Sequence, residues 1–531
     1  MSTDFKPGQG APIRYTALAA LLALAACGGS DDDTRPIAES CTTLAGKTLG
    51  AGSATITAAE LQAATPAAGA TAQAMPAYCK LSVAARDTGL KVGLWLPTEG
   101  WNGKLLMQGG GGFDGAIAAP TANLLVPYMS PSVVGERYAV MATNGGHEAT
   151  ENANGAFALD ATKLQEFAQT SEHRALPWGK ELVNAAYGKA PTRSYFEGCS
   201  MGGHDAMLLS QRYPEDFDGI VARAPAGNIM GLFPAFSRLS ITVRNPANRL
   251  TPAKQTLVAN MALAQCDGLD GLADGIISKP AACQPDLSAL RCAGGADAGD
   301  SCLSDAQLAT VNLITSPYAS ADGAHTHPGY NHGLEDSPAG WGQYIWPNAA
   351  GQSVQGGFAD GFVRGFITRD LAYDTDGWNP NDWLPRMAEV ATLFQAFNPD
   401  LSGMRARNAK LILWNGTNDS SVTSRDMGRY YQMAVARMGQ AAVDQTLEAF
   451  EAPGVGHCGG GPGADHVDLV KSLDTWVTAG TPPSGQNLVQ ARKTAAGDVA
   501  LTRPLCKYPA TPRYNGTGDA NSAKSFACVS D

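Results

Sequence analysis

The sequence predicts an α/β fold, in which helices flank a mainly parallel sheet. Two observations predict it. Short apolar runs of strand length alternate with a helix-compatible stretch before residue 200, and a similar pattern returns near residue 409 after a long gap. The chain has 531 residues, which is far more than one compact domain usually needs. We therefore expect a large insertion within the fold.

Four apolar runs predict the strands of the first part. They cover residues 92–96, 105–108, 138–142 and 194–197. A helix-compatible stretch over 172–187 precedes the last run. Strand and helix are thus expected to alternate up to residue 197.

A serine follows the last of these runs in a glycine-rich turn. Gly198-Cys199-Ser200-Met201-Gly202 matches G-x-S-x-G, in which glycines let a helix approach the preceding strand. The pentapeptide alone also occurs by chance, but here a helix over 204–212 and a strand over 218–225 are expected to follow. This order is typical of the nucleophile elbow. It predicts an α/β-hydrolase fold with Ser200 as the nucleophile.

The regular alternation fades in the middle of the chain. Over residues 226–400 aromatic residues accumulate, which favours a large inserted lid domain. A strand over 409–415 and a helix over 425–437 then resume the hydrolase pattern. We expect one hydrolase segment over 41–225 and a second, with a disulfide-stapled C-terminal tail, over 401–531.

The amino terminus has the pattern of an export signal. Two basic residues precede an apolar run that ends at residue 26, too short for a bilayer core of about 30 Å. We interpret residues 1–26 as a signal peptide. The Leu-Ala-Ala-Cys motif that ends at Cys27 resembles a bacterial lipobox, so lipidation of Cys27 is expected, with ordinary cleavage nearby as the alternative. Residues 27–40 would then form a flexible tether of an outer-membrane lipoprotein, or of a periplasmic or secreted protein.

Composition excludes some partners. Hydrophobic residues make up 44% and charged residues 16% of the chain, which is typical of a globular protein. The formal net charge of −11 makes binding to nucleic acid or to an anionic membrane through the surface field unfavourable.

Eleven cysteines become an even ten without Cys27, and an exported chain with ten cysteines indicates five disulfides. The sequence alone does not fix their pairing. Loop-closure entropy favours near neighbours. These are Cys41 with Cys79, Cys266 with Cys283, Cys292 with Cys302, and Cys506 with Cys528.

The remaining two cysteines flank residues of chemical interest. Cys199 precedes Ser200, and Cys458 follows His457. A disulfide holds its Cα atoms about 5.5 to 6 Å apart, so a bridge here would bring the two loops together. The alternative is a reactive thiol at Cys199, which requires a reducing compartment or a protected thiolate.

A serine hydroxyl needs a base, and His457 has the expected setting late in the chain. It follows a glycine-rich turn over 453–456, and a structural loop histidine is the alternative. The orienting carboxylate is expected between serine and histidine in chain order, beyond a strand end, where Asp419 lies. Asp426 competes for this role, but the amino-terminal dipole of a helix already explains it.

The oxyanion hole is expected to use the N–H of Met201 and one N–H of the early glycine loop. Four glycines over 109–112 directly follow the second expected strand. Gly110 or Gly111 is the expected donor, and a flexible turn is the alternative.

Two segments contain residue types that can bind metal. Asp267, Asp270 and Asp274 form an oxygen-rich group of the kind that Ca²⁺ prefers, although Asp-Gly turns alone also explain them. Three histidines occur in a polar loop without flanking ligands at fixed spacing, and we expect them to be solvated rather than metal-binding. They are His325, His327 and His332.

The motifs around Ser200, Asp419 and His457 resemble those of the tannase and feruloyl esterase family, and the tail over 502–528 resembles its bacterial, MHETase-like branch. The resemblance implies a carboxylic ester hydrolase that acts on feruloyl, galloyl or terephthaloyl monoesters through an acyl-enzyme. It also implies the bridge between Cys199 and Cys458 and the five-disulfide layout.

The resemblance further implies a structural Ca²⁺ in the lid and no organic cofactor. Its ligands would be Asp267, Asp270, Leu272, Asp274 and Ile276. Family substrates are held between the lid and the catalytic domain. The candidates for substrate contact are Trp341, Trp346, Arg364, Arg369 and Val422. The aromatic candidates are equally suited to an ordinary lid core, and an arginine would serve a free substrate carboxylate.

Two alternatives to the esterase stay open on the sequence. The same triad serves peptidases and acyltransferases. A non-catalytic surface lipoprotein that binds phenolic compounds on a hydrolase scaffold is the other alternative.

Overall fold

The computed structural model describes residues 36–130 and 133–530, and the chain from Pro36 onward forms one compact unit. The predicted signal peptide and Cys27 lie outside the described residues. The folded part begins earlier than the expected Cys41. Ile37 in α1 (Ile37–Ser40) is 3% exposed and belongs to the main core, so residues 36–40 are not a tether.

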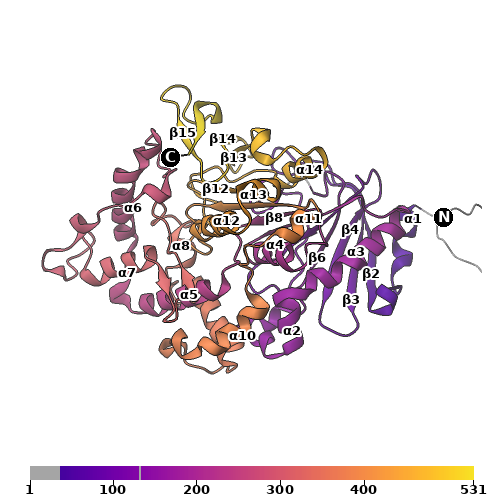
Figure 1. Cartoon of the computed structure of the whole chain (residues 1–531), viewed down its shortest axis with the longest axis horizontal. Coiled ribbons are helices and arrows are strands. Elements are labelled where there is room, and N and C mark those ends of the chain that lie inside the picture. The colour runs from indigo at the N-terminus through magenta and orange to yellow at the C-terminus, as the bar shows by residue number, and fades with distance from the viewer. Residues whose placement is uncertain (1–35, 131–132, 531) are drawn as a thin grey trace, which may run out of the picture. The chain divides into compact units, whose positions relative to one another are not determined.

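A ten-stranded sheet forms the centre of the molecule, in the order β1-β2-β3-β4-β6-β5-β7-β8-β11-β12 (Figure 1). The strands from β6 to β12 in this order run parallel, whereas β1 to β4 pair antiparallel, and β4 is antiparallel to β6. The mainly parallel sheet predicted from the sequence is therefore confirmed. The bounds are β1 (Thr48–Leu49), β2 (Ala54–Gln62), β3 (Tyr78–Ala85), β4 (Lys91–Pro97), β5 (Lys104–Gln108), β6 (Ala139–Thr143), β7 (Arg193–Cys199), β8 (Gly219–Arg223), β11 (Lys410–Gly416) and β12 (Leu447–Ala452).

Helices cover both faces of this sheet because side chains alternate along each strand. On β5, Leu105 and Met107 pack into the core shared with α3, α4 and α12, while Leu106 packs into the core under α14. The helices that connect or flank the strands of this sheet are α2 (Ala161–Gln165), α3 (Ser171–Tyr187), α4 (Met201–Arg212), α11 (Ser402–Ala406), α12 (Ser424–Met438), α13 (Gln440–Thr446) and α14 (Leu469–Ala479).

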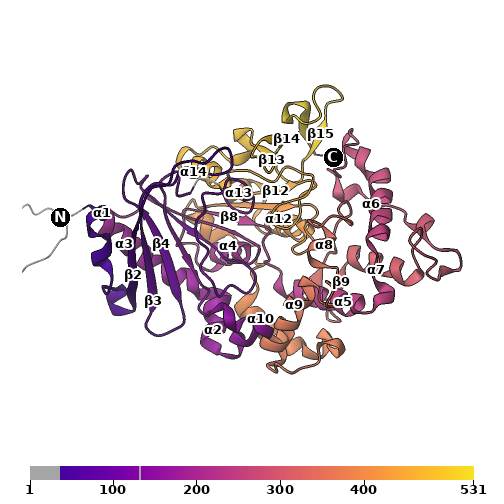
Figure 2. The same ribbon diagram turned by 180° about the vertical axis from the view of Figure 1, so that it is seen from behind.

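The segment between β8 and β11 contributes no strand to this sheet in the described residues. It contains a two-stranded pair, β9 (Tyr318–Ala319) with β10 (Thr326–His327), and several helices gathered at one side of the sheet (Figures 1 and 2). A second apolar core, including Phe233, Phe362 and Phe366, holds them together. The helices are α5 (Ile229–Arg244), α6 (Pro252–Cys266), α7 (Asp305–Thr315), α8 (Trp341–Tyr344), α9 (Val354–Gly361) and α10 (Leu384–Phe394). Domain boundaries at residues 226 and 400 stay a prediction.

The C-terminal tail forms two hairpins, β13 (Val489–Lys493) with β14 (Val499–Pro504) and β15 (Thr511–Tyr514) with β16 (Phe526–Val529). Arg503 in β14 pairs with Asp274 of the inserted segment at 2.5 Å. The tail therefore holds a loop of the insertion against the sheet domain.

Five disulfides connect the ten cysteines of the described residues. They are Cys41–Cys79, Cys199–Cys458, Cys266–Cys283, Cys292–Cys302 and Cys506–Cys528. None of the helices in residues 36–130 and 133–530 combines the length and apolar character needed to span a bilayer.

Candidate active site

Ser200 lies in a strained turn between β7 and α4. Its φ is 65° and its ψ is −114°, in a region that side chains rarely adopt. Gly198 permits the turn, since a Cβ there would lie 2.4 Å from the carbonyl oxygen of Gly202. The strain and the close approach are features of a nucleophile elbow.

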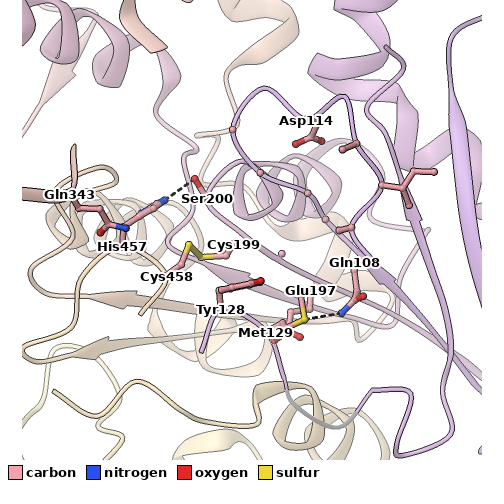
Figure 3. Close-up of a pocket in the computed structure, with 18 of the residues that line it drawn as sticks. Gln108, Asp114, Tyr128, Met129, Glu197, Cys199, Ser200, Gln343, His457 and Cys458 are labelled. Carbon is pink, nitrogen blue, oxygen red and sulfur yellow. Dashed lines mark hydrogen bonds between the residues drawn. A yellow bond between two sulfur atoms is a disulfide. The ribbon is translucent and has the colours of Figure 1, made fainter. Parts of the chain in front are cut away.

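Ser200, His457 and Asp419 form a continuous chain of hydrogen bonds. His457 Nε2 lies 2.9 Å from Ser200 Oγ, and His457 Nδ1 lies 2.7 Å from Asp419 Oδ2. Figure 3 marks the first of these hydrogen bonds with a dashed line. The other carboxylate oxygen of Asp419 accepts the N–H groups of Ser421 and Val422 at 2.7 and 2.8 Å. Asp419 is 2% exposed, so these bonds fix the carboxylate that orients the imidazole.

Asp426, the competing carboxylate, lies elsewhere. It accepts a hydrogen bond from Asn228 at 3.0 Å and forms an ion pair with Arg429 at 2.7 Å. Burial raises the pKa of Asp426 to about 6, although the positive charge of Arg429 partly opposes this rise. Its contacts are structural, and the geometry favours Asp419 as the partner of His457.

The disulfide between Cys199 and Cys458 links the two loops that carry Ser200 and His457. Its Cα atoms are 6.1 Å apart, although 259 residues separate the cysteines. The bridge removes the thiol that would be required for a cysteine nucleophile.

The glycine loop after β5 packs directly on the start of α4. The N–H of Gly202 donates to the carbonyl of Gly110 at 3.1 Å, and a Cβ on Gly109 would lie 2.7 Å from Gly202 Cα. The N–H of Ser200 donates to the carbonyl of Arg223. Met201 is the first residue of α4, so its N–H has no intrahelical acceptor. The glycine loop and the start of α4 therefore lie in direct contact next to Ser200, and the oxyanion hole expected there stays a prediction.

A cavity of about 500 Å³ opens at Ser200 and His457. The glycine loop, the end of β7, Asp114, residues 116–118, Tyr128 and Met129 form most of its wall (Figure 3). Gln343 and Tyr344 come from the inserted segment. The Tyr344 ring meets the His457 ring edge to face, with centroids 5.0 Å apart. Local sequence does not predict either residue as part of the site, because α8 spans only four residues and has no pattern that indicates its position.

Comparison with known proteins shows which family this chain resembles. The profile of the family described as tannase and feruloyl esterase matches residues 80–529. The chain belongs to this family. The resemblance noted in the sequence is confirmed, and the chain is a carboxylesterase.

Individual members of the tannase and feruloyl esterase family are similar over most of their length. Mono(2-hydroxyethyl) terephthalate hydrolase of Piscinibacter sakaiensis is 31% identical, covering 87% of this chain and 86% of the relative. Feruloyl esterase B of Aspergillus niger is 27% identical, with coverages of 82% and 83%. The crystal structure of feruloyl esterase B from Aspergillus oryzae matches with a TM-score of 0.80 and 26% identity, covering 93% of this chain and all of that one. The α/β-hydrolase fold is thereby confirmed.

The five residues expected to contact substrate in this esterase do not line the cavity at Ser200. Trp341 is 2% exposed and packs near Trp346, with ring centroids 6.3 Å apart. Arg364 lines a separate cavity of about 270 Å³. Arg369 donates to the backbone carbonyls of residues 158 and 159. Val422 acts on the triad instead, through its N–H to Asp419.

The aspartates expected to bind calcium in the esterase lie in one loop. Asp267 accepts the N–H groups of Asp274, Gly275 and Ile276, and one buried oxygen of Asp270 has no hydrogen-bond partner in the described residues. An unpartnered buried carboxylate oxygen fits a cation ligand. Within the described residues, no three His, Cys, Asp or Glu side chains form a metal-binding group by themselves. The expected ligand set therefore depends on the carbonyls of Leu272 and Ile276 as well.

The expectation of solvated histidines was wrong for two of the three. His327 is 2% and His332 is 8% exposed. His332 pairs with the buried Glu335 at 2.6 Å, and His327 Nδ1 accepts the N–H of Gly329. Side chains from distant segments donate to carbonyls of this loop, Asn228 to Thr326 and Arg425 to Pro328, and a polar local sequence does not reveal such tertiary contacts. His325 is less buried, and within the described residues the three histidines do not form a metal-binding group of three or more ligands.

Proposed function

We propose that this esterase hydrolyses esters of aromatic acids through an acyl-enzyme on Ser200. The hydrogen-bonded chain from Ser200 through His457 to Asp419, at the wall of a cavity, is the observation that carries the proposal. In the first step His457 Nε2 takes the hydroxyl proton while Ser200 Oγ bonds to the ester carbonyl carbon. The carbonyl oxygen becomes an oxyanion.

The two halves of the reaction are completed by the same residues. The N–H of Met201 and a backbone N–H of residues 110–111 stabilise the oxyanion. As the ester C–O bond breaks, His457 returns its proton to the departing alcohol. Water then gives a proton to His457 and attacks the acyl carbon, and Ser200 leaves with that proton as the free acid forms. Asp419 keeps the imidazole in the tautomer that faces Ser200.

The substrate class follows from relatives and from the cavity. The names of the relatives specify feruloyl esters and a terephthalate monoester, both esters of aromatic acids. The cavity of about 500 Å³ accommodates a single aromatic ring, and Tyr128 and Tyr344 line it. Galloyl, feruloyl and terephthaloyl monoesters are the candidates.

A structural Ca²⁺ is the second part of the proposal. Asp267, Asp270 and Asp274 would hold it together with the carbonyls of Leu272 and Ile276. When bound, the ion would neutralise buried carboxylates and brace the loop; it would take no part in ester cleavage. The unpartnered oxygen of Asp270 supports this assignment.

Export is the third part. Five disulfides suit an oxidising compartment, in agreement with the signal pattern over residues 1–26. A lipid on Cys27 would anchor the mature chain to a membrane.

Hydrolysis of methyl gallate, methyl ferulate and mono(2-hydroxyethyl) terephthalate by wild type and Ser200→Ala tests the function. We expect turnover of at least one ester that falls by about 10³-fold or more in the variant. Parallel assays of the matching amides and of acyl transfer to an added alcohol separate a peptidase or an acyltransferase. Binding of the esters without turnover would favour the non-catalytic lipoprotein.

A further inference from the structure

The cavity beside Ser200 has hydrogen-bond acceptors toward both ends. Figure 3 shows Gln343 next to His457, and Asp114 beyond Ser200 on the far side of the glycine loop. Gln343 Oε1 and Asp114 Oδ1 have no hydrogen-bond partner in the described residues, and neither has Oε1 of Gln108, which is 2% exposed. A buried acceptor without a partner is unfavourable, so a bound hydroxyl group that donates to it would stabilise the complex.

The Asp114 carboxyl is held in place by the loop that precedes it. Its backbone N–H donates to the carbonyl of Gly111 at 3.0 Å, and its φ of 31° turns the chain sharply. A Cβ on Gly110 would lie 2.8 Å from Asp114 Oδ1, and one on Gly145 would lie 3.2 Å from Oδ2. Both glycines therefore leave room for a carboxyl group at a fixed position in the cavity wall.

Other acidic groups surround Asp114. The carboxylates of Asp205 in α4 and Glu172 in α3 both repel a negative charge on Asp114. Asp205 Oδ1 lies 3.1 Å from His204 Nδ1, and Glu172 accepts hydrogen bonds from Thr143 and Ser171. Burial raises the pKa of Asp114 well above its usual range, and repulsion from Asp205 and Glu172 adds to it, while backbone N–H groups oppose the shift. The same burial and repulsion would act on any carboxylate that a substrate brought to this end of the cavity.

The described lining of the cavity includes no lysine or arginine. Arg223 is fully buried and donates to Glu197 of the cavity wall at 2.9 Å. Arg364 lines the separate cavity and donates to Asn154 and to the carbonyl of Tyr373. A negative charge bound beside Ser200 would thus have no cationic partner in this wall, and an unpaired buried charge is strongly unfavourable.

We propose that Asp114 and Gln343 make this cavity selective for an uncharged aromatic ester that bears hydroxyl groups, and that an ester with a free carboxylate is a poor substrate. The inference rests on the proposed function and deepens it. It separates this chain from its relative named for a terephthalate monoester, whose substrate carries one free carboxyl group.

Two matched pairs of esters test the selectivity at neutral pH. Methyl 3,4-dihydroxybenzoate against methyl benzoate reports recognition of hydroxyl groups, and dimethyl terephthalate against monomethyl terephthalate reports rejection of charge. We expect kcat/KM to favour the first member of each pair by at least about tenfold. Equal or reversed preference in either pair would overturn the inference while leaving esterase activity intact. If the protein cleaves none of the four esters, the result counts against the proposed function itself.

Variants then assign the effect to residues. Asp114→Leu and Gln343→Met each should reduce the preference for the dihydroxy ester at least about fivefold, whereas Asp114→Asn, which keeps hydrogen-bonding atoms, should retain most of it. Gln343→Arg adds a cation and should raise relative turnover of the monomethyl ester at least about tenfold. Thermal unfolding identifies a misfolded Asp114→Leu, in which case Gln343→Met decides.

Arg364→Gln is the control for the second cavity. We expect it to leave both preferences unchanged. If wild type favours the monomethyl ester and Arg364→Gln abolishes that preference, the proposal is overturned, and the substrate carboxylate binds at Arg364 instead. Unchanged preferences in both Gln343→Met and Asp114→Leu would also overturn the proposal.

Discussion

Cys199 and Cys458 form a disulfide that lies one residue before Ser200 and one residue after His457. Because the bridge joins loops distant in sequence, it supports the 2.9 Å contact between Ser200 and His457. Replacing both cysteines by serine should lower kcat more than it changes KM, and should lower the free energy of unfolding by about 2–5 kcal/mol. Steady-state kinetics and urea unfolding measure the two effects.

The matched control for the disulfide is removal of Cys506–Cys528 in the tail. That change should lower stability and leave kcat near the wild-type value, since the tail bridge does not touch the cavity. Equal losses of kcat from both double variants would mean that the disulfide near Ser200 has only a general stabilising effect.

Asp419 and Asp426 can be distinguished by the same isosteric change. Asp419→Asn removes the acceptor of the His457 Nδ1 proton and should lower kcat by about 10³- to 10⁴-fold. Asp426→Asn should keep kcat within a few fold, because the charged and amide partners of Asp426 in the described part of the chain are Asn228 and Arg429 rather than His457. A larger loss in Asp426→Asn than in Asp419→Asn would reverse the assignment.

Calcium should stabilise the loop without taking part in turnover. Removal of divalent ions by a chelator should lower Tm by several degrees, and added Ca²⁺ should restore it. Asp270→Asn should lower Tm and abolish the response to Ca²⁺. Arg503→Gln, which removes the ion pair to Asp274, should lower Tm but keep the response. A wild-type Tm that neither treatment changes would rule out the ion.

Buried histidines should make the protein less stable in mild acid. Burial lowers the pKa of His204 to about 4, so between pH 6.5 and 4 the unfolded chain binds a proton that the folded chain does not. Stability therefore falls as pH falls through this window, by up to about 3 kcal/mol from this residue. Urea midpoints from pH 7 to 4 should show the decline, and His204→Gln should flatten it. A wild-type midpoint that is constant across the window would contradict the sign.

The sequence predicted those parts of the site that depend on local order. Ser200 sits in a motif between a strand and a helix, and Asp419 follows a strand that was recognisable from its apolar run. His457 follows β12 in the same way. These residues meet because parallel strands end at one edge of a sheet, so strand order alone brings them together.

The remaining features depend on tertiary contacts that local patterns do not encode. β2 carries the sequence ATITAAELQ, in which small and polar residues obscure the strand periodicity, and the antiparallel edge was not predicted. Gln343 and Tyr344 reach the cavity from a four-residue helix that packing of the insertion positions. Tryptophans are also candidates for substrate contact on sequence grounds, yet Trp341 is buried in the apolar core of the insertion.

Formation of an acyl-enzyme on Ser200 tests the central claim most directly. Wild-type protein and Ser200→Ala are mixed with excess 4-nitrophenyl ferulate, quenched in acid within milliseconds and digested for peptide mass spectrometry. The account predicts a feruloyl mass increment on the peptide that contains Ser200, together with a burst of nitrophenol, and neither in the variant. Turnover without acylation of Ser200, or undiminished turnover by Ser200→Ala, would contradict it.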